Sequence, residues 1–325
     1  MKQLIAVLLN PTIDQIYEIE NFHVGGTFKV NQSVVFPVGK AISFSLGVRQ
    51  LNDERNIIKV IACIGKDEIP LYSTFLKSKK IDFEFIEVNG KTRSNKTIND
   101  PIEKTTTHIR EKGFDLDGRT LAEFKKVIKN NMREGNLFTF SGSIPPNVND
   151  DIYFEFINSC REIGLETALD ANGTSLTEGI KAKPTIIKPN LLELSQILRD
   201  PKLNDLNFSD NHQALDFIMN NASKLLDEKT KIILITLGKN GAILLTKNKH
   251  FYGNIKVEQV IDTVGSGDSF LAGFILNYFK KKDMLECFKH ALACGAANTL
   301  IPGPGIFKKE DAMKLYKKII LVELS

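Results

Sequence analysis

Short apolar runs alternate with helix-period segments along this chain of 325 residues, and this alternation restricts the possible folds more than any other feature. The apolar runs lie at residues 3–9, 57–64, 137–143, 165–170, 185–190 and 231–238. The segments with a helical period lie at residues 117–131, 149–163, 210–227, 267–281, 283–299 and 308–321. Because most of the runs are apolar without interruption, they predict strands that are buried on both faces. The sequence therefore predicts an α/β fold with an open, mostly parallel sheet flanked by helices.

Two stretches break this alternation, at about residues 15–36 and 92–110. Both are rich in Thr and Val, contain turn residues and lack a helical period, so they predict paired antiparallel strands. Such strands would form a small β sheet that projects from the main sheet as a lid or as the contact of a homodimer. Neither stretch is long enough to fold alone, so residues 1–325 are predicted to form a single domain.

Composition argues against several classes of function. The 43 Lys and Arg residues nearly balance the 39 Asp and Glu residues, and the basic runs at residues 77–80 and 280–282 fall at predicted helix ends. These runs indicate solvated surface rather than a track for nucleic acid. The four cysteines form no CxxC pair and join no histidine at metal-ligand spacing, which indicates reduced core thiols. With no run near the roughly 18 apolar residues of a membrane helix, a cytoplasmic protein that binds neither nucleic acid nor membranes is expected.

Polar residues follow several of the predicted strands. Asp14 follows the first strand, Ser141 begins "SGSIPP", Asn190 and Glu193 follow "TIIKP", and Thr236 begins "TLGKNGA". In an open α/β sheet a ligand lies beyond the carboxyl ends of the strands. These residues are therefore candidates for a binding site.

The stretch "DTVGSGDSFLAGF", residues 262–274, is the most informative of these junctions. Gly265, Ser266 and Gly267 precede Asp268, and apolar residues then follow at helical spacing. Small residues at a helix start let backbone amides face an anion, and an aspartate in the first turn can accept a proton from a hydroxyl beside that anion. Alternatively, Ser266 or Asp268 caps the helix and the glycines only turn the chain.

Two common nucleotide-binding motifs are absent from the sequence. Gly39-Lys40 is followed by Ala and Gly238-Lys239 by Asn, so the chain has no GxxxxGK[ST] loop. The "GSGDSF" segment lacks the third glycine of GxGxxG.

Taken together, the motifs resemble the PfkB or ribokinase-like carbohydrate kinases. The second signature of that family is similar to "DTVGSGDSFLAGF". The similarity extends through "NPTID" at 10, "TRSN" at 92, "SGSIPP" at 141, "IIKPNLLEL" at 186, "TLGKNGA" at 236 and "PGPG" at 302. The order and spacing of these motifs most resemble the branch that contains 1-phosphofructokinase and tagatose-6-phosphate kinase.

This resemblance implies a ribokinase-like fold and the transfer of the γ-phosphoryl group of ATP to a hydroxyl of a ketohexose phosphate. Fructose 1-phosphate, fructose 6-phosphate and tagatose 6-phosphate are the acceptors that it implies. In this interpretation Asp268 is the base, and Gly265, Ser266 and Gly267 stabilise the migrating phosphoryl group. Asn190 and Glu193 would help to hold Mg²⁺ through water. However, Asn followed three positions later by Glu is also the pattern of a helix capping box.

The resemblance implies roles for further residues. Lys188 would meet the triphosphate, and the remaining nucleotide-binding positions are Thr236, Gly238, Gly241 and Asn298. Asp14 would bind sugar hydroxyls and Arg93 the phosphate of the acceptor, although without the family Arg93 is only a surface arginine. The other expected substrate-binding positions are Lys29, Gly39, Lys40, Ser43 and Ser141.

The chain departs from the family where relatives carry Pro-Gly-Gly-Lys-Gly-x-Asn, because this sequence reads "PVGKAIS". Val38 is expected to prevent an easy positive φ and to fill space beside the sugar, and Ser43 is shorter than asparagine. Lys29 also replaces a usual arginine, and His108 and Arg110 replace a usual Glu and Asn. An altered or broadened acceptor preference is predicted.

Two other functions stay open at this point. The change at "PVGKAIS" is consistent with a nucleotide-binding sensor that has kept the fold with little turnover. A nucleoside or ribose kinase of the same fold is the other alternative, although Arg93 favours an acceptor that already bears phosphate.

Overall fold

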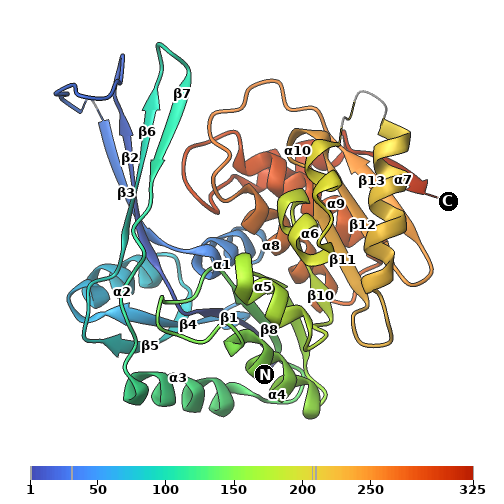
Figure 1. Cartoon of the computed structure of the whole chain (residues 1–325), viewed down its shortest axis with the longest axis horizontal. Helices are drawn as coiled ribbons and strands as arrows, with labels where there is room; N and C mark the ends of the chain where they lie inside the picture. Colours follow the sequence, from blue (N-terminus) through green and yellow to red (C-terminus); the bar gives the residue numbers. More distant parts are fainter. Residues whose placement is uncertain (1, 31, 207, 209–210, 325) are drawn as a thin grey trace.

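The computed structural model describes residues 2–30, 32–206, 208 and 211–324. Within these residues a large sheet of ten strands has the order β14-β13-β12-β11-β10-β9-β8-β1-β4-β5 (Figure 1). Its strands are β1 (Leu4–Leu8), β4 (Ile58–Gly65), β5 (Asp82–Val88), β8 (Leu137–Ser141), β9 (Glu166–Asp170), β10 (Ile186–Ile187), β11 (Ile232–Thr236), β12 (Ala242–Thr246), β13 (His250–Asn254) and β14 (Ile320–Leu324). Neighbouring strands in the series β11-β10-β9-β8-β1-β4-β5 pair in parallel. At the other end of the sheet, β12, β13 and β14 are joined to β11 and to one another by antiparallel pairing. The predicted fold class is confirmed.

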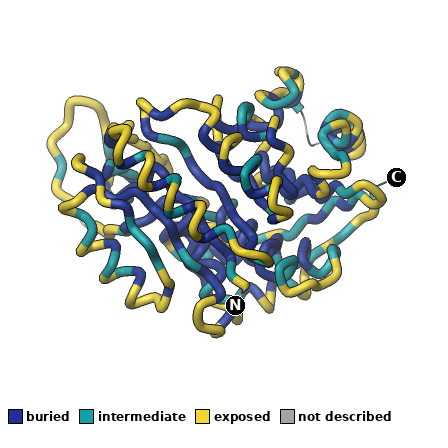
Figure 2. The backbone as a smooth tube through the Cα atoms, turned by 90° about the horizontal axis from the view of Figure 1, so that it is seen from below, coloured by how far each residue is buried: buried dark blue, intermediate teal, exposed yellow. Residues whose placement is uncertain are grey.

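Helices cover both faces of this sheet. They are α1 (Lys40–Leu51), α2 (Ile69–Ser78), α3 (Gly118–Asn131), α4 (Ile152–Glu162), α5 (Gly173–Ile180), α6 (Leu191–Leu198), α7 (Asn211–Ala222), α8 (Ser266–Phe279), α9 (Met284–Asn298) and α10 (Lys309–Tyr316). Helices α1, α2, α8 and α9 share one apolar core with the sheet, while α3 to α7 share the other. Figure 2 shows the resulting buried strands between exposed outer helix faces.

Strand β1 shows why the apolar runs are uninterrupted. Ile5 and Val7 contribute to one core, whereas Leu4, Ala6 and Leu8 contribute to the other. Successive side chains of a strand point to opposite faces, so a strand covered on both sides is mostly apolar on both faces. The apolar runs of the sequence therefore identify the centre of the sheet.

One predicted helix is wrong in part. The segment at 308–321 was expected to be a single helix, but α10 ends at Tyr316 and Ile320–Leu324 form β14. Strand β14 pairs with β13 at the edge of the sheet, so its residues are only partly buried. A short edge strand that directly follows a helix carries no period of its own by which a sequence could reveal it.

The two Thr- and Val-rich stretches form the predicted small sheet. The first gives β2 (Thr12–Glu18) and β3 (Gln32–Val38), and the second gives β6 (Ser94–Asp100) and β7 (Thr105–Ile109). Each pair is antiparallel, and the two hairpins join through a parallel pairing of β2 with β6. The small sheet projects from one end of the large sheet (Figure 1).

The remaining compositional expectations concern cysteines and membrane spans. The four cysteines are buried and unpaired, as predicted. In the described part of the chain, no helix combines the length and the apolar character that crossing a bilayer requires.

Candidate active site

A cavity of about 800 Å³ lies where the carboxyl ends of the parallel strands meet the small sheet. Most of the residues selected from the sequence line it. They are Asp14, Gly39, Lys40, Ser43, Arg93, Lys188, Asn190, Thr236, Gly238, Gly241, Gly265, Ser266, Gly267 and Asp268. The common location follows from topology, because the strands of a parallel sheet all end at the same edge.

Four of the selected residues do not line this cavity. Lys29 is exposed in the segment between β2 and β3. Ser141 is buried at the end of β8, directly before the cavity-lining Gly142. Glu193 is buried in the first turn of α6. Asn298 is fully buried and accepts from the Ser269 hydroxyl at 2.7 Å. It therefore supports the start of α8 from the buried side of the helix.

The start of α8 has a specific backbone conformation. Gly265 is the N-cap residue with φ of 78°, and no side chain caps the helix, so the purely capping interpretation of Ser266 or Asp268 does not hold. The Ser266 amide donates to the Thr263 carbonyl at 3.2 Å. The next two amides, those of Gly267 and Asp268, are therefore the donors that this helix start offers to an anion.

The two glycines at this helix start serve different purposes. A Cβ atom at Gly265 would lie 2.5 Å from the Gly305 backbone nitrogen and 2.6 Å from the Pro304 Cα atom. A Cβ atom at Gly267 would meet only the Lys188 Nζ atom, at 3.5 Å. Gly265 thus permits the turn to pack against the loop at residues 303–305, and Gly267 keeps the space next to Lys188 open.

This difference gives a first prediction, for Gly265→Ala. We expect a loss of about 2–4 kcal/mol in the free energy of unfolding, because a positive φ and two backbone contacts both disfavour the methyl group. Gly164→Ala is the matched control, since Gly164 has φ of 76° with no atom within 4 Å of a Cβ atom. That control should lose only about 1–2 kcal/mol. Equal losses in urea unfolding of the two variants would show that the loop contact does not matter.

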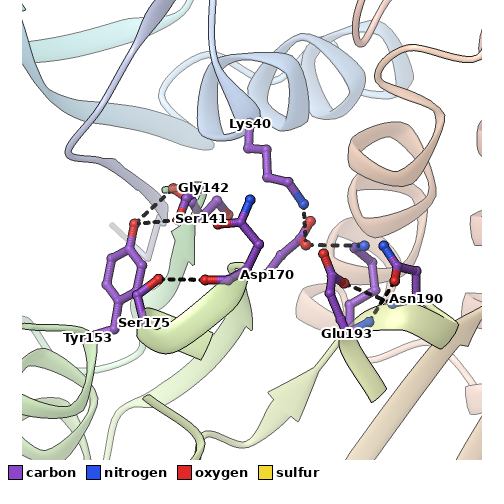
Figure 3. Close-up of polar contacts among 10 residues, drawn as sticks. Lys40, Ser141, Gly142, Tyr153, Asp170, Ser175, Asn190 and Glu193 are labelled. Carbon is purple, nitrogen blue, oxygen red and sulfur yellow. Dashed lines mark hydrogen bonds and ion pairs between the residues drawn. The ribbon is translucent and has the colours of Figure 1, made fainter. Parts of the chain in front are cut away.

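A buried cluster of charges lies beside the helix start. The Asp170 Oδ1 atom accepts from the Lys40 Nζ atom at 2.6 Å (Figure 3). The same oxygen lies 3.2 Å from the Lys188 Nζ atom. Burial tends to raise the pKa of Asp170, but Lys188 and Lys40 outweigh it and hold this pKa below its usual value. The other carboxylate oxygen of Asp170 is buried without a partner among the described residues.

Asp170 was missed at the sequence level, although a signal for it existed. It is the last residue of β9 and follows the apolar run "LETAL". The junction rule that selected Asp14 after the first strand would have selected Asp170 as well.

Asp268 is buried and close to these charges. Burial raises its pKa to about 7, with a further contribution from Asp170, while Lys40 and Lys188 act in the opposite direction. A carboxylate with a pKa near neutrality is well suited to accept a proton in a reaction at neutral pH. Burial likewise raises the pKa of Glu193.

Asn190 and Glu193 do form a capping box at the start of α6. The Asn190 Oδ1 atom accepts from the Glu193 amide at 2.9 Å, and the Glu193 Oε2 atom accepts from the Asn190 amide at 2.8 Å. The second carboxylate oxygen of Glu193 takes no part in the box. No group of three His, Cys, Asp or Glu side chains among the described residues is arranged to hold a metal ion.

The small sheet supplies the other end of the cavity. Asp14 accepts from the Thr12 hydroxyl at 3.0 Å and from the side-chain amide (Nδ2) of Asn95 at 3.2 Å. Burial raises the pKa of Asp14 despite these bonds. Arg93 donates from Nε to the Pro11 carbonyl at 3.1 Å and from Nη2 to the Asn10 carbonyl at 3.0 Å.

The "PVGKAIS" segment differs from the expectation in one respect. Val38 was expected to fill space beside the substrate, but its side chain lies in the apolar core and does not line the cavity. The positive φ of this segment belongs to Gly39, at 133°, so the turn into α1 is retained. Of the three replaced positions, only Ser43 lines the cavity.

Comparison with known proteins identifies the family. The model of the pfkB family of carbohydrate kinases matches residues 7–311. The chain belongs to this family. Kinases of the family are phosphotransferases that use ATP as the phosphate donor, generally with Mg²⁺.

Individual relatives cover nearly the whole chain. It is 26% identical over 292 residues to 1-phosphofructokinase of Bacillus subtilis, a match that covers 90% of this chain and 91% of that protein. It is 28% identical over 335 residues to tagatose-6-phosphate kinase of Staphylococcus epidermidis, covering 99% of this chain and all of that protein.

Solved structures show the same fold. Phosphofructokinase-2 from Escherichia coli in complex with substrates and products superposes with a TM-score of 0.86 at 19% identity, over 97% of this chain and 98% of that chain. Ribokinase from Thermotoga maritima gives a TM-score of 0.71 at 19% identity, over 97% and 99% of the two chains. This pfkB-family kinase therefore has the ribokinase-like fold that its motifs predicted.

Proposed function

We propose that this pfkB-family kinase transfers the γ-phosphoryl group of ATP to a hydroxyl of a ketohexose phosphate. Fructose 1-phosphate, fructose 6-phosphate and tagatose 6-phosphate are the candidate acceptors, and the product is a bisphosphate. One observation carries the proposal: Asp268 and the open amides of α8 share a cavity with Arg93 and Arg110, which flank strands β6 and β7 of the small sheet. The relatives named for 1-phosphofructokinase and tagatose-6-phosphate kinase support the acceptor class.

The nucleotide would lie over the large sheet. Thr236, Gly238 and Gly241 line this part of the cavity, and a bridge between Asn190 and Thr236 holds two of the strand ends together. Lys188 would contact the phosphates, since it is a cation at the open space beside Gly267. The unpartnered oxygen of Asp170 and the free oxygen of Glu193 are suited to bind the water molecules of a hydrated cation. Mg²⁺, when bound, supplies charge neutralisation at the phosphates.

The transfer itself requires positioning and charge stabilisation rather than a covalent intermediate. The Asp268 carboxylate accepts the proton of the attacking hydroxyl. The amides of Gly267 and Asp268 donate to the oxygens of the migrating phosphoryl group, supported by the positive end of the helix dipole. Lys40 lies close enough to influence the pKa of Asp268, so it adds positive charge at the same point.

The acceptor would lie between Asp268 and the small sheet. Asp14 is fixed by Thr12 and Asn95 and can accept hydrogen bonds from sugar hydroxyls. Arg93 keeps donor protons on its two terminal nitrogens beyond those used for the carbonyls, so it can still bind a phosphate. Ser43 has a single short hydroxyl, and we expect a broader choice among the acceptors for this reason.

The small sheet would also join two copies of the chain. Val34 and Val35 on β3 are 44% and 48% exposed, which leaves apolar surface on this sheet. Phosphofructokinase-2 of Escherichia coli has been solved in a tetrameric inhibited form. For this chain we infer a homodimer through the small sheet.

The test of the proposed function is ATP consumption across a panel of acceptors. We expect turnover with at least one ketohexose phosphate and a kcat/KM at least about tenfold lower with the matching free sugar, because each charged hydrogen bond to phosphate contributes about 1.5–3 kcal/mol. Turnover with nucleosides or ribose alone would overturn the proposal in favour of a nucleoside kinase. Binding of ATP with no turnover on any acceptor would overturn it in favour of a sensor.

A further inference from the structure

One row of polar side chains crosses the small sheet and faces the cavity. Asp14 on β2 is paired in register with Asn95 on β6. The antiparallel pairing of β6 with β7 ends at Lys96 and Ile109, so the next position in the same register places Asn95 opposite Arg110. Neighbours in register point to the same face of a sheet. In agreement, Asp14, Asn95 and Arg110 all line the cavity.

Arg110 has no direct partner for its guanidinium group in the described part of the chain. Among the described residues it forms no ion pair and no side-chain hydrogen bond. The adjacent Glu111 is engaged elsewhere, because it accepts from the Lys96 ammonium at 2.8 Å and from the Ser94 amide at 2.8 Å. Asp14, the acid of the same row, is already bonded to Thr12 and Asn95. The guanidinium is therefore free to bind a ligand.

Arg93 adds a second positive charge nearby. Asp14, Arg93 and Arg110 line the same cavity. Burial lowers the pKa of Arg93, Asp14 raises it, and Arg110 lowers it further. Two arginines against one carboxylate leave an excess of positive charge at this end of the cavity. The two main-chain bonds of Arg93 fix its orientation, so its terminal nitrogens present a preformed site.

We propose that Arg110 is a second ligand for the phosphate group that the acceptor already carries, acting together with Arg93. This inference rests on the proposed function, since it concerns the acceptor of that reaction. Ser43 stands where relatives carry a longer asparagine, so it can make fewer contacts with the acceptor. A second arginine at the small sheet would supply binding energy that Ser43 does not.

The test is Arg110→Gln, measured by steady-state kinetics with the sugar phosphate that the wild type uses. We expect KM for that acceptor to rise about 10- to 100-fold, as for loss of a charged hydrogen bond. The kcat should stay within about threefold and KM for ATP should not change, because the lost contact is made equally in the ground state and the transition state. Inorganic phosphate should compete with the acceptor in the wild type and more weakly in the variant. Arg110→Lys keeps the positive charge but lacks the planar guanidinium group, so its KM for the sugar phosphate should lie between those of the wild type and Arg110→Gln.

Lys104→Gln is the matched control. Lys104 lies in the turn between β6 and β7 of the same hairpin and does not line the cavity, so its removal should leave all constants unchanged. If Arg110→Gln leaves KM for the sugar phosphate unchanged while the wild type is active, the inference is wrong and the proposed function stands. If KM rises as much for the unphosphorylated sugar, Arg110 does not bind the phosphate. If the wild type uses no phosphorylated acceptor, both the inference and the proposed function fail.

Discussion

Replacing Asp268 with Asn is expected to lower kcat by a factor on the order of 10² or more, with little change in ATP affinity. The amide keeps the size of the side chain and cannot accept the proton of the hydroxyl. The same variant should be more stable than the wild type at pH 8. Burial raises the folded pKa of Asp268 to about 7 from the 3.8 of an ordinary aspartate, so the ionised form is disfavoured by folding.

Because the pKa of Asp268 is raised in the folded chain, the contribution of this residue to stability depends on pH. Between pH 4 and 7 the folded chain retains a proton that the unfolded chain has released, so the contribution of this group to the free energy of unfolding falls as the pH rises. We expect the Tm of Asp268→Asn to exceed that of the wild type by about 2–5 °C at pH 8, and the difference to shrink at pH 5.5. In the wild type, kcat/KM should decline below about pH 7 as the base becomes protonated.

Glu310→Gln is the control for this experiment. Glu310 is also an acid in the first turn of a helix, but it is exposed on α10. Glu310→Gln should keep normal turnover, and its Tm should differ from that of the wild type by the same small amount at pH 8 and at pH 5.5. Near-normal turnover of Asp268→Asn would show that another group is the base.

Replacing Asp170 with Asn is expected to cost about 3–5 kcal/mol of the free energy of unfolding. The substitution removes the direct ion-pair partner of Lys188, which is 4% exposed, and of the partly buried Lys40. The folded pKa of Asp170 is lower than usual, so this stabilisation is complete above about pH 4 and is lost as the pH falls further. Urea unfolding at pH 7 measures the loss.

The control for this second prediction is Glu178→Gln. Glu178 pairs with Lys181 at 2.5 Å, but this pair is exposed on α5. Its loss should cost no more than about 0.5 kcal/mol. Addition of ATP without Mg²⁺ should stabilise Asp170→Asn by more than it stabilises the wild type, because the phosphates would replace the missing negative charge next to the two lysines. A cost as small as that of the control would mean that solvent already screens the cluster.

Much of this architecture could be predicted from the sequence. The apolar runs at β1, β4, β8, β9 and β11 identified the parallel strands, because a strand buried on both faces is apolar at most positions. The motif around Asp268 identified the helix start, since only glycine fits a turn with positive φ next to the loop at residues 303–305. The edge strands β5 and β14 were missed, because partly exposed strands do not carry such a pattern. Strands β12 and β13, which lie inside the sheet, were missed as well, although β12 is a buried apolar run.

The roles of charged residues depended on tertiary structure instead. Asp170 and Lys40 are 130 residues apart in the chain, and only the convergence of strand ends brings them to 2.6 Å. The sequence assigned Val38 to the pocket, but the direction of its side chain was decided by the register of β3 against β2. From the sequence, Arg110 was one of several departures that predicted a change in acceptor preference, and only the register of β7 placed it in a row with Asp14.

The sequence by itself determined the elements, the family and the helix start that offers amides to a phosphate, because these depend on the local pattern of side chains and on glycine φ angles. Only the tertiary structure decided which charges neighbour one another and how deeply they are buried. That distinction has a physical basis: the pKa of Asp268 and the free charge of Arg110 depend on distance and on exclusion of water, and neither is encoded by position along the chain.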